Sequence, residues 1–72
     1  MKATEIIKTI MSIRGLNQGD LTTMLGLAYQ SSVSGRLNRD MKMSSLAEFA
    51  KVLNCEVVMR DLTTGEEYQI TE

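Results

Sequence analysis

QGDLTTMLGLAYQSSVSGRLN, residues 18–38, is the stretch of sequence that decides the fold. Its apolar residues form two groups with three- or four-residue spacing, the spacing of one face of a helix. The two groups are Leu21, Met24 and Leu25, then Val33 and Leu37. Gly26 lies between them and readily adopts the left-handed conformation that ends a helix. The stretch therefore predicts helices at about 18–25 and 30–37, joined by a turn.

Two further amphipathic helices are predicted, one on each side of this stretch. Residues 3–14 carry apolar side chains at helical spacing, and Gly15 can end that helix. Residues 45–53 show the same spacing. Their inward-facing residues are Leu46, Phe49, Ala50 and Leu53.

Polar residues at the predicted helix ends support these boundaries. Asn17 is a favourable N-cap, and Asp20 places negative charge in the first turn that follows. Ser45 and Glu48 have the spacing of a capping box at the start of the last helix. Asn54 tolerates the left-handed conformation at its exit.

After Cys55 the apolar period changes from near four to near two, which predicts a β-hairpin with strands at about 56–60 and 66–70. Gly65 can take the positive φ that a hairpin loop needs. Two faces follow from the alternation: Val57, Met59, Tyr68 and Ile70 on one, and Val58 with Leu62 on the other. A lone hairpin is marginally stable in water, so we expect it to pack on the helices or on a partner.

Length and composition predict one domain, spanning residues 1–72, with 43% apolar and 24% charged residues. The expected fold class is mainly α: four helices followed by a C-terminal β-hairpin. A chain this short buries only about 60% of the surface that its unfolded form exposes. We therefore expect it to gain stability from a second copy, as a homodimer.

Several classes of function are disfavoured by what the sequence lacks. With no His and a single Cys, we expect no metal, no cofactor and no intrachain disulfide. The absence of His also removes the usual proton shuttle, and Cys55 has no base partner, so we expect no enzyme. No apolar run approaches the roughly 18 residues of a membrane span, and the N-terminus lacks a signal-peptide core. The expected location is the cytoplasm.

The charges are unevenly distributed along the chain. The net charge is −1, and a pI near 5.3 by itself disfavours nucleic-acid binding. Residues 1–55, however, contain seven cations and four anions, a balance of +3, whereas residues 56–72 contain one cation and five anions, a balance of −4. The helical part is therefore the side of the molecule suited to DNA.

Taken together, these motifs resemble the Cro and phage-repressor type of helix-turn-helix domain, the lambda-repressor-like fold. The resemblance covers roughly residues 6–53 and rests on four motifs. They are Gly15-Leu16-Asn17-Gln18, Leu21 with Leu25-Gly26, Gln30-Ser31-Ser32-Val33-Ser34, and the closing helix Leu46 to Asn54. The turn is one residue longer than is common in the family, as in some small bacterial and phage members that also end in a hairpin, which leaves the register of the third helix open by one position.

The resemblance implies that the third helix lies in the major groove of double-stranded DNA, as in a transcriptional repressor. Gln30 would then contact a base, because its amide can donate to and accept from adenine at once. Ser31 and Ser34 are the other base-contact candidates, and Ser32 is left as a cap or a solvent-facing residue. The competing interpretation is that Gln30 and the serines are ordinary polar helix residues.

A second set of residues would contact the DNA backbone. The resemblance implies that Gln18, at the start of the second helix, binds a phosphate and supports Gln30. The remaining candidates are Tyr29, Arg36, Asn38, Arg39 and Lys42. The alternatives are turn packing for Tyr29 and a solvated charged face for the cations.

The hairpin suggests a partner surface, with the homodimer interface expected at Val58, Met59, Leu62, Tyr68 and Ile70. A different class of function remains open: an antitoxin or protein-interaction module that binds a basic protein partner through the acidic hairpin. A third is a purely structural use of the fold, without DNA.

Overall fold

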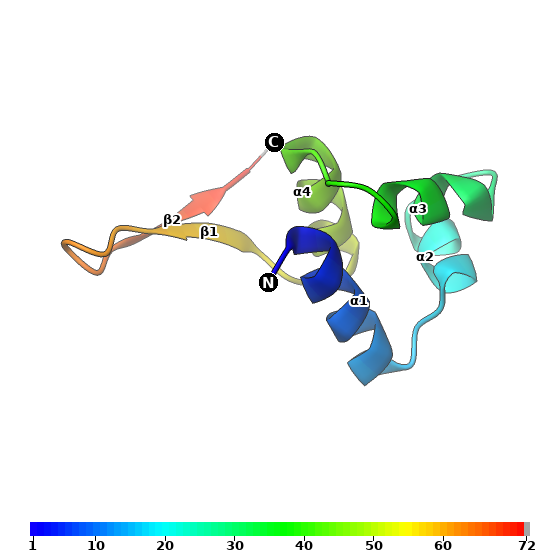
Figure 1. Cartoon of the computed structure of the whole chain (residues 1–72), viewed down its shortest axis with the longest axis horizontal. Helices are drawn as coiled ribbons and strands as arrows, with labels where there is room; N and C mark the ends of the chain where they lie inside the picture. The colour runs from blue at the N-terminus through cyan, green and yellow to red at the C-terminus, as the bar shows by residue number, and fades with distance from the viewer. Residues whose placement is uncertain (72) are drawn as a thin grey trace.

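The fold consists of four helices followed by a two-stranded antiparallel hairpin, in a computed structural model that describes residues 1–71. The helices are α1 (Ala3–Arg14), α2 (Gln18–Met24), α3 (Gln30–Leu37) and α4 (Met43–Val52), and the strands are β1 (Val57–Arg60) and β2 (Glu67–Ile70). Figure 1 shows the helices gathered on one side and the hairpin extending away from them. The prediction of a mainly α-helical fold with a C-terminal hairpin is confirmed.

The helix ends are set by a few local interactions. Gly15 has φ +66° and closes α1, and its N–H donates to the carbonyls of Met11 and Ser12. Asn17 and Asp20 form the capping box of α2: Asn17 Oδ1 accepts from Asp20 N at 2.8 Å, and Asp20 Oδ2 accepts from Asn17 N at 2.9 Å. These two contacts satisfy backbone donors that the first turn of a helix leaves unpaired.

The start of α4 differs from the prediction. The helix begins at Met43, two residues before the expected start, with Lys42 as its N-cap and no side-chain capping bond. Met41 is partly buried against the core and Lys42 is extended, so the chain turns into the helix before it reaches Ser45. The predicted capping box of Ser45 and Glu48 is therefore wrong, and α4 ends at Val52, with Leu53 as its C-cap.

Smaller differences occur at three other ends. α2 stops at Met24, with Leu25 as its C-cap, and each strand is one residue shorter at its start than predicted. Helix α3 covers the predicted residues, so the longer turn does not shift its register.

The core lies between the four helices, each of which contributes apolar side chains to it. Its buried residues are Ile7, Met11, Leu21, Val33, Leu37, Phe49, Ala50 and Leu53. Every residue of the hairpin is at least partly exposed. Burying a side chain of this size stabilises a fold by about 1.5–3 kcal/mol, so the helical body is the stable part of the molecule.

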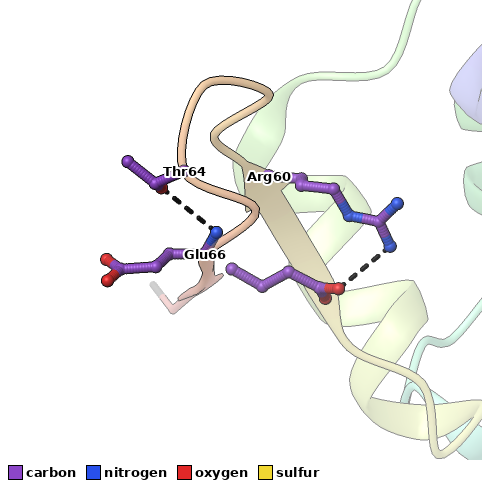
Figure 2. A network of polar contacts seen from close by, with 4 residues as sticks. Arg60, Thr64 and Glu66 are labelled. Atoms are coloured by element: carbon purple, nitrogen blue, oxygen red, sulfur yellow. Dashed lines mark hydrogen bonds and ion pairs between the residues drawn. The ribbon is translucent and has the colours of Figure 1, made fainter.

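The hairpin is a narrow extension of this body. Its register pairs Val57 with Ile70 and Met59 with Tyr68, the shared face expected from the alternation. Gly65 has φ +79° in the loop. Figure 2 shows two polar contacts near the loop: the ion pair from Arg60 to Glu67 and the Glu66 N–H that donates to Thr64 Oγ1. The molecule reaches 42 Å along its longest axis because the hairpin projects.

Within residues 1–71, no helix combines the length and apolar character that crossing a bilayer requires.

Candidate nucleic-acid interface

Helix α3 packs on the body through one face and leaves the other free. Val33 and Leu37 are buried in the core. Because α-helical residues recur every 3.6 positions, Ser31, Gly35 and Asn38 lie on the side of α3 opposite to these two. All three are exposed. The free face of α3 is therefore small and polar.

Gly35 is in the middle of this free face and has no packing role. A Cβ built at this position meets nothing within 4 Å among the described residues beyond the helix itself. Glycine in a helix interior lowers the free energy of unfolding by roughly 1 kcal/mol relative to alanine. No neighbouring segment would clash with an alanine at this position. Close packing of α3 against another described segment therefore does not explain Gly35.

Gln30, the predicted base contact, is exposed in the first turn of α3. Its Oε1 lies 3.7 Å from the point where a Cβ on Gly19 would stand. Gly19 is the second residue of α2, and a Cβ there would be in ordinary contact with Gln30 Oε1 but only 3.1 Å from Asn17 Oδ1, so the missing side chain leaves room for the Asn17 cap. Sequence reasoning missed Gly19, whose only signal is an unexplained glycine one position after Gln18.

The two serine candidates differ in their surroundings. Ser31 is exposed, whereas Ser34 is half-buried, and its Oγ accepts from Asn38 Nδ2 at 3.3 Å. Ser31 is therefore more accessible to a ligand on this face than Ser34. Gln30 lies on the same side of the helix as Val33 and Leu37 and is exposed because it is in the first turn.

Of the backbone-contact candidates, Tyr29 directly precedes Gln30 in the chain, and Gln18 directly precedes Gly19, which lies near the Gln30 side chain. Tyr29 is the N-cap of α3 and its side chain is 72% exposed, so packing in the turn does not explain it. Gln18 begins α2 and is half-buried. Each therefore stands at the N-terminus of one of the two helices.

The cationic candidates meet at the other end of α3. Arg36, Arg39 and Lys42 line a groove of about 410 Å³ between the end of α3 and the start of α4. Ser44 and Ser45 also line it, as do the acidic Asp40 and Glu48. The groove thus combines three cations with two carboxylates and two hydroxyls, an excess of one positive charge.

Arg36 is not free in this groove. Its Nη1 donates to Glu48 Oε2 at 3.0 Å, and its side chain retains 27% exposure. The contact joins α3 to α4. Glu48, which the sequence suggested as a cap, therefore neutralises one of the three cations.

A second arginine holds the base of the hairpin. Arg14, at the end of α1, donates to the carbonyl of Leu53, and its Nη2 lies 3.7 Å from Cys55 Sγ. Two segments separated by 39 residues are joined in this way. Nothing in the sequence indicates this contact, because it depends on how α1 packs beside α4.

The predicted interface residues of the hairpin are exposed in differing degrees. Met59, Leu62 and Tyr68 are 65%, 91% and 56% exposed, Val58 is 40% exposed, and Ile70 is half-buried near the helices. Tyr68 Oη donates to Glu66 Oε2 at 2.7 Å. This hydrogen bond to Glu66 raises the pKa of the Tyr68 phenol, because the carboxylate stabilises the protonated form.

The described residues contain no cluster of three or more His, Cys, Asp or Glu side chains placed to hold a metal ion. Comparisons with protein-family models, with curated proteins and with solved structures find no match for this chain.

Proposed function

We propose that this chain is a sequence-specific regulator of transcription that binds double-stranded DNA as a cytoplasmic homodimer and acts as a repressor. In this proposal α2 and α3 form a lambda-repressor-like helix-turn-helix unit, and α3 enters the major groove. The observation that carries it is the free face of α3, with Gly35 at its centre. A bare helical surface that the fold itself does not need fits a helix that approaches the walls of a groove closely.

The chemistry and position of each candidate residue decide whether it is assigned to a base or to a phosphate. Gln30 and Ser31 contact bases, because they are exposed polar groups in the first turn of α3. Ser34 is a weaker candidate, since Asn38 already donates to it. Gln18 and Tyr29 would then bind phosphates on one side of α3, and Arg36, Asn38, Arg39 and Lys42 on the other.

The charge distribution supports this orientation. The helical residues 1–55 carry +3 and the segment 56–72 carries −4. Polyanionic DNA would therefore meet the helical body, and the acidic hairpin would point away from it.

The test is a fluorescence-anisotropy titration of a duplex selected from a random pool and of a scrambled duplex with the same composition. Gln30→Ala should weaken binding to the selected duplex by about 5- to 150-fold, from the roughly 1–3 kcal/mol of a bidentate base contact. Binding to the scrambled duplex should hardly change. Equal losses on both duplexes would remove Gln30 from base readout.

A matched pair of cation variants tests the backbone contacts. Arg39→Ala should weaken binding to both duplexes alike and reduce the slope of log K against log salt by about 0.9. Lys8→Ala removes an exposed cation from α1 and should leave the slope unchanged. The reverse pattern would assign the DNA surface to α1 instead.

The protein-interaction alternative, in which the acidic hairpin binds a basic protein, stays a prediction. Specific retention of a small basic protein, together with no binding to any duplex at low salt, would favour it over the DNA proposal.

A further inference from the structure

The hairpin, here called the arm (residues 57–70), follows α4 through a short segment whose backbone is fixed. Asn54 takes a φ of +56° directly after the C-cap of α4, and Cys55 N donates to the carbonyl of Ala50 at 2.7 Å. A left-handed residue followed by this bond is the Schellman motif that closes a helix. Strand β1 begins two residues after Cys55. The segment 53–56, here called the joint, therefore leaves the arm little freedom of direction.

Arg14 of α1 holds the joint from a second side. Its guanidinium donates to the carbonyl of Leu53, the C-cap of α4, and its Nη2 lies 3.7 Å from Cys55 Sγ. The last carbonyls of a helix have no partner within the helix and carry its partial negative charge, so a cation is favourable there. Leu53 itself is buried in the core. Arg14 therefore links the base of the arm to the helical body.

The joint lies between the arm and the helices proposed to bind DNA. Figure 1 shows α2 and α3 at one end of the long axis and the loop of the arm at the other, with α1 and α4 between them. Over about 20 Å, half of the 42 Å length of the molecule, a rotation of about 10° displaces an element by about 3.5 Å, roughly the rise of one base pair. A modest change of angle at the joint therefore moves α3 relative to the arm on the scale of a base pair.

We propose that Arg14 is a positioning residue for DNA binding. By holding the joint, it fixes the direction of the arm relative to α3, and with it the separation of half-sites that two copies accept. The inference rests on the proposed function, with the two copies joined through the hairpin as the sequence predicts. Arg14 belongs neither to the predicted DNA contacts nor to the predicted dimer interface.

The physical reason for the effect is the conformational freedom of the arm. A dimer with rigid joints presents its two α3 helices at one separation, and each added base pair lengthens the site by about 3.4 Å and rotates the second half-site by about 34°. Without the Arg14 contact the arm samples more directions, so the dimer accepts more separations. It then binds the best separation less tightly, because that freedom is lost on binding.

The test uses duplexes with two copies of the selected half-site, at the preferred separation or one base pair closer or farther apart, and a duplex with a single half-site. In anisotropy titrations the wild type should prefer the best separation at least tenfold. Arg14→Met should reduce this preference at least threefold and leave the affinity for the single half-site within twofold. Arg14→Lys, which keeps the charge and one donor group, should restore part of the preference.

Two further variants complete the comparison. Lys8→Met makes the same kind of replacement at an exposed cation of α1 and should keep the wild-type preference. Asn54→Gly loosens the joint without Arg14, because glycine adopts the same φ and many others, and should reduce the preference as Arg14→Met does. Circular dichroism checks that each variant is folded.

Three results would overturn the inference and leave DNA binding intact. An unchanged preference in folded Arg14→Met would mean that the Schellman motif alone fixes the arm. An equal loss on every duplex, with a salt slope reduced by about 0.9, would make Arg14 a phosphate contact instead. A wild type that binds the single half-site and shows no preference among separations would mean that the joint does not set the spacing. A wild type that binds no duplex would contradict the proposed function, and the inference with it.

Discussion

The guanidinium of Arg36 on α3 lies 3.0 Å from the carboxylate of Glu48 on α4. This contact joins α3 to α4. It also pairs Arg36 with a carboxylate, although the proposed function has Arg36 bind a phosphate. In the free protein, Glu48 thus holds the position that a phosphate oxygen would take beside Arg36.

Glu48→Gln should therefore increase affinity for any DNA sequence. Removing the carboxylate frees Arg36 to release one more counterion, so the salt slope should become steeper by up to about 0.9. The cost in stability should be within about 1 kcal/mol, because the pair is partly exposed.

The control for this variant is Glu67→Gln, which breaks the other ion pair, at 2.9 Å on the hairpin. It should leave DNA affinity unchanged. If Glu48→Gln weakened DNA binding instead, Glu48 would orient Arg36 toward the phosphate and would not compete with the phosphate for it.

Gly35→Ala should raise the free energy of unfolding and lower the affinity for DNA. The fold should gain about 0.5–1 kcal/mol, since alanine is the better helix former and its Cβ meets nothing nearby. DNA affinity should fall, because the methyl group stands on the face that approaches the groove.

Urea denaturation and anisotropy on the same preparation measure the two effects. Ser12→Ala on the exposed side of α1 is the matched change and should leave binding unaltered. A Gly35→Ala protein that is more stable and binds DNA as well as the wild type would exclude a close approach at this position.

Asn17→Ala should cost about 1 kcal/mol of unfolding free energy. The side chain accepts the N–H of Asp20 at 2.8 Å, and alanine leaves that donor without its cap. Urea denaturation measures the loss, and Asn17→Ser should restore most of it, because serine also accepts this bond. No difference between the two variants would mean that the cap does not stabilise α2.

Arg14→Met should loosen the base of the arm. The variant keeps most of the side-chain volume and loses the donation to the Leu53 carbonyl, a bond expected to contribute about 1 kcal/mol. Hydrogen exchange should speed up for the amides of β1 more than for those of α2. Equal protection of the β1 amides in the wild type and in Arg14→Met would show that α4 alone holds the hairpin in place.

Much of this structure is encoded locally and can be predicted from the sequence. The apolar spacing at Val33 and Leu37 and the glycine at position 15 suffice for α3 and for the end of α1. The alternation around Met59 and Tyr68 likewise suffices for the hairpin register.

The remainder depends on packing between distant segments. Ser45 looks like a cap in sequence, but the partly buried Met41 draws the start of α4 forward to Met43. Arg36 and Glu48 look like separate surface charges in the sequence, and only the fold brings their side chains together. The approach of Gln30 to the start of α2 depends in the same way on how α2 and α3 pack together.

In the proposed function the first turn and the free face of α3 bind double-stranded DNA, and an unbiased selection of duplexes from a random pool is the most direct test. We predict enrichment of a two-fold symmetric site with half-sites about 10 base pairs apart, and loss of that enrichment with Gln30→Ala. A pool that shows no enrichment and no retention even at low salt would contradict it.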